Sequence, residues 1–124
     1  MVEDKVRSAA VFYLTEALWR KLLREARTVY KMPVYRVTVG DAAPVAVIQR
    51  NDWLELGGEE PKGACLSIPN KSSGWSCKIS TDLVDDLYDG PLHTQWLGWE
   101  LIIVLWDEFE KHNDDYMEEL CQKP

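Results

Sequence analysis

The most constraining feature of this chain lies near its C-terminus, where residues 96–120, WLGWELIIVLWDEFEKHNDDYMEEL, change from strongly apolar to strongly acidic. One set of positions recurs there in alternating steps of three and four: Trp99, Ile102, Trp106, Phe109, Asn113, Tyr116 and Leu120. This is the spacing of a helix seam carried over three heptads. A strand would need a period of two, which the sequence DEFE at 107–110 breaks. The sequence therefore predicts a Trp-rich acidic helix over about residues 94–120.

The first half of this predicted helix is also apolar away from the seam, at Leu101, Ile103 and Leu105. A helix that is apolar all round must be covered on more than one side. A sheet and another helix cover part of it, and a second copy is the simplest remaining cover, because two-fold dimers are the commonest soluble oligomers. The expected interface residues of this homodimer are Trp99, Ile102, Trp106, Phe109, Asn113 and Tyr116. The alternative is that the whole segment fits inside one α+β core.

Residues 3–31 carry a second helical pattern. Its apolar positions recur at spacings of three and four: Val11, Leu14, Leu18, Leu22, Ala26 and Val29. Pro33 ends the pattern, because proline cannot continue a helix. We predict one long N-terminal helix. The alternative is a short strand at residues 9–14, AAVFYL, followed by a helix.

Between the two helical patterns the sequence predicts a small antiparallel sheet of about four strands. Residues 34–50 and 62–80 each read as a β-hairpin around turn residues. In the second hairpin, keeping both apolar sets inward pairs Leu66 with Trp75 and Ala64 with Cys77. A short helix should follow over residues 80–90. The length of 124 residues suits a single α+β domain over 1–124.

The net charge of −7 is unevenly spread, with +4 over residues 1–36 and −10 over residues 80–124. An acidic total argues against direct nucleic-acid binding, which needs a basic footprint. It favours a basic protein or a cationic small molecule as partner. The asymmetry also suggests that the basic first helix and the acidic last segment lie near each other, within one chain or between two.

Residues 1–10 are charged where a signal peptide would need an apolar stretch. The longest uninterrupted apolar run, Leu101–Trp106, is far shorter than the roughly 18–20 residues that span a bilayer. The three cysteines lack CxxC spacing, which suits reduced thiols. We therefore expect a cytoplasmic protein that does not enter a membrane.

Catalytic chemistry has few candidates in this sequence. His112 with Glu108 lacks the paired-histidine spacing of a zinc site, and the nucleotide and hydrolase motifs GxGxxG, GxxxxGK[ST] and GxSxG are missing from the sequence. We expect no catalytic residue, no metal and no cofactor. An aromatic pocket with an acid at its rim would suit an organic cation, and Trp75, Trp96 and Glu100 are the predicted residues for it.

Residues 21–56 show one local likeness, closest at 44–53, PVAVIQRNDW. The stretch resembles the antitoxin pattern of the prevent-host-death family: a Leu-Leu helix, a hairpin, then Pro-Val-Ala-Val, an aromatic residue and a leucine. The resemblance covers less than a third of the chain and is not taken as membership. The resemblance implies a toxin-neutralising, operator-binding dimer.

The sequence supports three functional hypotheses, in order of preference. The first is a non-enzymatic binding or adaptor module that dimerises through the C-terminal helix. The second is a small-ligand domain, or a small enzyme, with an aromatic and acidic pocket for an organic cation. The third is an acidic inhibitor of the antitoxin or immunity type that binds a basic protein.

Overall fold

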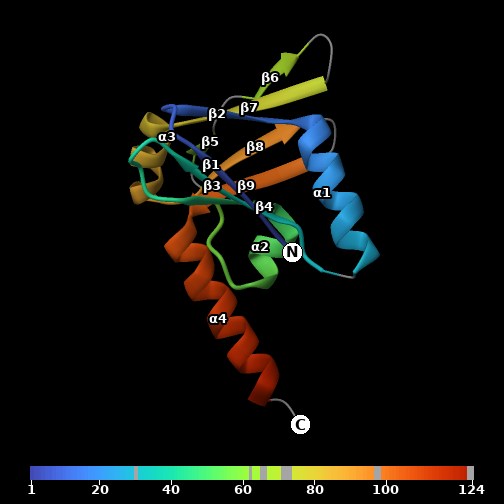
Figure 1. Cartoon of the computed structure of the whole chain (residues 1–124). Helices are drawn as coiled ribbons and strands as arrows, with labels where there is room; N and C mark the ends of the chain where they lie inside the picture. Colours follow the sequence, from blue (N-terminus) through green and yellow to red (C-terminus); the bar gives the residue numbers. More distant parts are fainter. Residues whose placement is uncertain (30, 62, 65–66, 71–73, 97–98, 123–124) are drawn as a thin grey trace.

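A computed structural model of the chain has an α+β architecture (Figure 1). It describes residues 1–29, 31–61, 63–64, 67–70, 74–96 and 99–122; the side chains within residues 63–75 and 95–99 and at residue 122 lie outside the description. The helices are α1 (Glu16–Thr28), α2 (Arg50–Glu55), α3 (Thr81–Asp86), the 3-10 helix η1 (Leu87–Asp89) and α4 (Trp106–Gln122). The strands are β1 (Val2–Arg7), β2 (Val11–Thr15), β3 (Val34–Val39), β4 (Val45–Gln49), β5 (Gly63–Ala64), β6 (Ser67–Asn70), β7 (Gly74–Ser80), β8 (Leu92–Trp96) and β9 (Trp99–Leu105).

The described strands form two sheets. The larger has six strands in the order β1-β3-β4-β9-β8-β5, and the smaller has three in the order β2-β7-β6. The larger sheet is mixed: β1 runs parallel to β3 at one edge and β5 runs parallel to β8 at the other, while the inner pairs are antiparallel. The predicted four-stranded antiparallel sheet is therefore only part of the architecture.

Both faces of the larger sheet are covered (Figure 1). On one face, α1 and the smaller sheet bury a core that includes Trp19, Leu22 and Ile103. On the other face, α2 and the first part of α4 bury a second core that includes Trp53 and Ile102. Because the central strands are buried on two sides, they read as nearly continuous apolar runs.

The predicted helix over 94–120 is wrong in its first half. Residues 99–105 form strand β9, which pairs with β4 from Val45↔Leu105 to Gln49↔Leu101, and the helix begins only at Trp106. Leu101 and Ile103 face one core while Ile102 faces the other, so the alternation of a strand accounts for the all-round apolar character. The apolar half of the segment, which forms β9, is covered within the chain and does not require a second copy to bury it.

The predicted single helix over 3–31 is also wrong, and the alternative of a strand before a helix is nearer the structure. Strand β2 alternates between buried Phe12 and Leu14 and exposed Tyr13. The hydroxyl of Thr15 then accepts a hydrogen bond from the Leu18 amide at 3.3 Å, which caps α1 at its N-terminus. Residues 2–7 form a further strand that pairs in parallel with β3, a long-range contact that local periodicity cannot reveal.

The hairpin over 34–50 is confirmed, because β3 and β4 pair antiparallel. The short helix over 80–90 is confirmed too, as α3 and η1, capped by the Ser80 hydroxyl. In the hairpin over 62–80 the predicted register is wrong by three residues: Pro69 pairs with Trp75, and Ala64 belongs to β5 beside β8. In the described part of the chain, no helix combines the length and apolar character needed to cross a bilayer.

Candidate functional site

Helix α4 begins where β9 leaves the sheet. The amide of Trp106 donates to the Pro44 carbonyl at 2.9 Å, and Asp107 and Glu108 follow at the positive end of the helix dipole. The Trp106 indole donates to the Glu110 carboxylate at 2.8 Å, and the Arg36 guanidinium lies 5.3 Å from the ring centroid. These contacts fix the first turn of α4 against the sheet.

A hollow of about 390 Å³ lies between this part of α4 and the start of β1. Its residues come from the N-terminal segment, the α1–β3 connection, β3 and α4: Met1, Val2, Met32, Val34, Trp106, Phe109, Glu110, Asn113 and Asp114. The terminal amine of Met1 donates to the Met32 carbonyl at 2.6 Å, which holds the chain start beside the hollow. Burial lowers the pKa of this amine, and the charge of Lys31 lowers it further. Three of the predicted interface residues, Trp106, Phe109 and Asn113, therefore meet at one surface hollow.

The apolar stripe of α4 continues beyond the hollow toward the free end of the helix. Met117 is 52% exposed and Leu120 is 44% exposed. Both follow Asn113 at helical spacing, so they lie on the side of α4 that faces the hollow. We call this set the groove face of α4: Trp106, Phe109, Asn113, Met117 and Leu120. Figure 1 shows the C-terminal part of α4 extending away from the two sheets.

Charges of opposite sign occupy two separate helices. On α4 the exposed acids outnumber Lys111 by seven to one: Asp107, Glu108, Glu110, Asp114, Asp115, Glu118 and Glu119. On and just after α1 five basic side chains are exposed: Arg20, Lys21, Arg24, Arg27 and Lys31. Figure 1 places α1 and the free end of α4 well apart. Among the described residues, no ion pair joins Lys21, Arg24, Arg27 or Lys31 to an acid.

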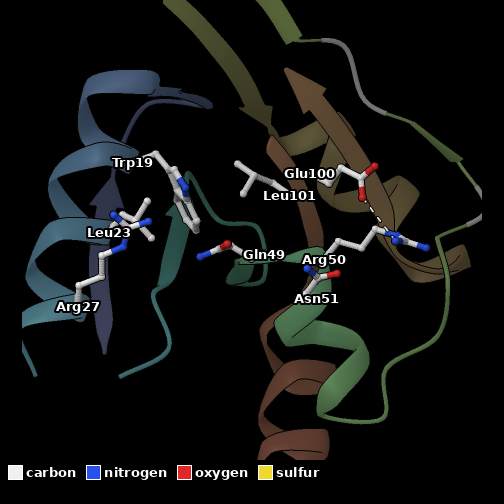
Figure 2. A pocket seen from close by; sticks show the side chains of 8 residues that line it. All are labelled: Trp19, Leu23, Arg27, Gln49, Arg50, Asn51, Glu100 and Leu101. Carbon is white, nitrogen blue, oxygen red and sulfur yellow. Dashed lines mark hydrogen bonds and ion pairs between the residues drawn. The ribbon is translucent and has the colours of Figure 1, made fainter. Parts of the chain in front are cut away.

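A second hollow, of about 300 Å³, lies between α1, the start of α2 and β9 (Figure 2). Trp19, Leu23 and Arg27 approach it from α1, and Arg50 and Glu100 face it from the other side. Arg50 lies 3.5 Å from Glu100 and also pairs with Glu60. Among the described residues, Glu100 thus shares its hollow with two arginines, Arg27 and Arg50.

The predicted interface residues have different surroundings. Ile102 and Phe109 are buried in the core of this chain, and Ile102 sits in a central strand. The Tyr116 hydroxyl donates to the Glu55 carboxylate at 3.2 Å, which turns this side chain toward α2, and the hydrogen bond raises the pKa of the phenol. The side chains of Trp75, Trp96 and Trp99 lie outside the described part of the structure, so their predicted roles stay predictions.

Sequence reasoning missed Met117. Its signal was present, because a helix that starts at Trp106 has Asn113, Met117 and Leu120 in phase on one side. With the helix assumed to start at residue 94, the predicted seam continued from Asn113 to Tyr116 and so left out Met117.

Metal-binding clusters of three or more His, Cys, Asp or Glu side chains do not occur among the described residues. Of the thiols there, Cys77 is buried and Cys121 is exposed at the free end of α4. Comparison with known proteins gives no assignment: no protein family, no curated protein and no solved structure matches this chain.

Proposed function

We propose that this chain is a non-enzymatic binding module of the cytoplasm that forms a homodimer through the groove face of α4. In the dimer the acidic α4 of one copy lies against the basic side of α1 in the other. The observation that carries the proposal is the exposure of Met117 and Leu120 on a helix that is otherwise strongly acidic. About half of the surface of each of these two large apolar side chains is left uncovered in one copy.

Charge complementarity favours a second copy as the occupant. A single chain presents a basic helix and an acidic helix that lie apart (Figure 1). A two-fold axis brings each helix of one copy to the opposite helix of the other, so both contacts form at once. From the sequence, the two charged segments were expected to meet within one chain or between two, and their separation within the chain favours the second possibility.

The two kinds of contact contribute differently. Burying Met117 and Leu120 would contribute up to about 1.5–3 kcal/mol each. Exposed ion pairs are worth about 0–1 kcal/mol each and mainly set orientation and association rate. A dimer of this kind should need the apolar pair for its affinity and the charges for its geometry.

The first test removes the apolar pair. Sedimentation equilibrium should show a dimer for the wild-type chain and a monomer for the double variant Met117→Glu, Leu120→Glu. These side chains are exposed in a single copy, so the variant should fold, which circular dichroism checks. Tyr88→Glu is the matched control, because Tyr88 is 66% exposed on η1 and lies outside the groove face. A wild-type chain that stays monomeric at every concentration overturns the proposal.

The second test reverses charge. Lys21→Glu with Arg24→Glu should weaken the dimer by about tenfold or more, because like charges would then face each other across the contact. The control is Lys78→Glu with Arg7→Glu, which removes two exposed basic side chains away from α1. Wild-type affinity should also fall as salt is raised, since salt screens exposed charges. If neither salt nor the charge reversal on α1 changes the affinity of the dimer, the pairing of α1 with α4 is contradicted.

One competing occupant has a specific observation in its favour. Seven exposed acids on α4 exceed the five basic side chains of α1, so the helix also suits a basic partner protein. A monomeric wild-type chain that binds a basic protein through Met117 and Leu120, with an affinity that falls with salt, would favour the inhibitor hypothesis over self-association.

A further inference from the structure

A third hollow, of about 350 Å³, lies on another side of α4, where the helix meets the loop after α2 and the η1 turn. Its aromatic residues are Trp53, Tyr88 and His112, which come from three different elements. Its volume is within the range of small-molecule sites. The groove face of α4 does not contribute to it, so ligand binding in this hollow is independent of the proposed dimer.

Trp53 is a rigid wall of this hollow. Its indole donates to the Glu59 carbonyl at 2.8 Å, and the His112 ring meets it edge-on with centroids 5.0 Å apart. Gly58 packs directly on the indole: a Cβ at that position would come within 1.9 Å of a Trp53 ring carbon. The ring is therefore held in place on several sides before any ligand arrives, which limits the ordering cost of binding.

Apolar and acidic residues both line the hollow. Leu87 and Val104 are buried beneath the hollow. The carboxylates of Glu59, Asp89 and Glu108 stand around it, and all three side chains are exposed. Within the described residues, none of the three forms an ion pair, and neither lysine nor arginine lines the hollow. This differs from the hollow around Glu100, where Arg27 and Arg50 supply positive charge.

We infer that this hollow binds an organic ammonium ion with small apolar substituents. The exposed Tyr88 ring can attract such a cation, and buried Trp53 and Leu87 form the floor beneath it. Three carboxylates, which form no ion pair among the described residues, supply the opposite charge. From the sequence, a cation pocket was predicted around Trp75, Trp96 and Glu100. The geometry points to the same ligand chemistry at a separate place, beside Tyr88 and Glu108, and the roles predicted for Trp75, Trp96 and Glu100 stay predictions.

The test compares choline with its neutral isostere, 3,3-dimethylbutan-1-ol, by isothermal titration calorimetry and by nuclear magnetic resonance of the indole N–H groups. Choline should bind saturably. The alcohol should bind at least about tenfold more weakly, because the two molecules differ only in charge. Sodium chloride at matched concentration controls for simple screening of the acids. The affected indole signal should be that of Trp53, which Trp53→Phe identifies.

Two variants test the site residues in the full chain. Glu108→Gln and Tyr88→Ala should each weaken choline binding by about threefold to tenfold, since each removes one element of cation recognition. Glu118→Gln is the matched control, an exposed acid on the same helix away from the hollow. Equal binding of choline and the alcohol, no saturable binding of choline, or equal effects of Glu108→Gln and Glu118→Gln would each overturn the inference.

Discussion

Tyr35 shows how one side chain fastens a helix to the sheet. It is buried in β3, and its hydroxyl donates to the Leu18 carbonyl in α1 at 2.7 Å. Its ring also lies 6.0 Å from that of Trp19. Burial raises the pKa of the Tyr35 phenol to about 12, with smaller contributions from the charges of Glu3 and Glu25. The neutral, hydrogen-bonded form is the one that the fold requires.

Removing this hydroxyl should have a defined pH signature. Tyr35→Phe should lower the free energy of unfolding by about 1 kcal/mol at pH 7, because a buried hydrogen bond is lost. In the wild-type chain the phenol holds its proton up to about pH 12 when folded, and only to about pH 10 when unfolded. Its contribution is thus fully present below pH 10 and is lost as the pH rises toward 12.

Urea unfolding at pH 7, 10 and 11.5 measures this effect of Tyr35 on stability. The difference between the wild-type and Tyr35→Phe chains should shrink with rising pH, and Tyr13→Phe at half-exposed Tyr13 should be neutral at pH 7. A difference between the wild-type and Tyr35→Phe chains that stays constant over this range would contradict the assignment.

At the scale of elements, the junction between β9 and α4 explains the main prediction error. Strand β9 is apolar on both faces, so its period of two is hidden, and Trp99 and Ile102 happen to stand three residues apart. The spacing of three and four residues reflects a helix only from Trp106 onward, where α4 begins. The same coincidence put Val11 and Leu14 of β2 in phase with α1.

Other parts of the fold were readable because their signals are local. The turn between β3 and β4, the Ser80 cap and the helical face of α1 at Leu22 and Ala26 all lie within short stretches of sequence. The pairing of β1 with β3, and the placement of β5 and β6 in different sheets, depend on distant partners. Of the candidate site, Trp106, Asn113 and Leu120 were found through periodicity, whereas Met117 depended on knowing where the helix starts.

The two-sided burial of β9 makes a direct prediction. Ile102→Ala and Ile103→Ala should each lower the free energy of unfolding by about 2–4 kcal/mol, because each leaves a cavity in a different core. Because the two side chains face opposite cores, the double variant should lose roughly the sum of the two effects. Val6→Ala at an exposed position on the edge strand β1 serves as the control and should change little. A cost below about 1 kcal/mol for either isoleucine would contradict coverage of both faces.

At the scale of the whole molecule, the part of α4 that packs against the core is distinct from the part that is exposed. The sheets, α1, α2 and α3 form the two cores, and α4 contributes to the one around Trp53 through Phe109, with Trp106 and Tyr116 packed against it. From Met117 to Cys121 the helix is exposed. The hollow around Trp53 and His112 lies before that point, so self-association and cation binding use different parts of the same helix.

This separation predicts the behaviour of a chain that ends at Tyr116. It retains Phe109, the hydrogen bond from Tyr116 to Glu55 and the whole cation hollow, and it lacks Met117 and Leu120. Partner binding to the native state raises apparent stability by mass action. The melting temperature of the full chain should therefore rise over a hundredfold increase in protein concentration, whereas that of the shortened chain should stay constant. Choline affinity should be equal in the two chains. If both melting temperatures rise equally with concentration, the free end of α4 is not the dimer contact, whereas weaker choline binding by the shortened chain would mean that the hollow depends on that end.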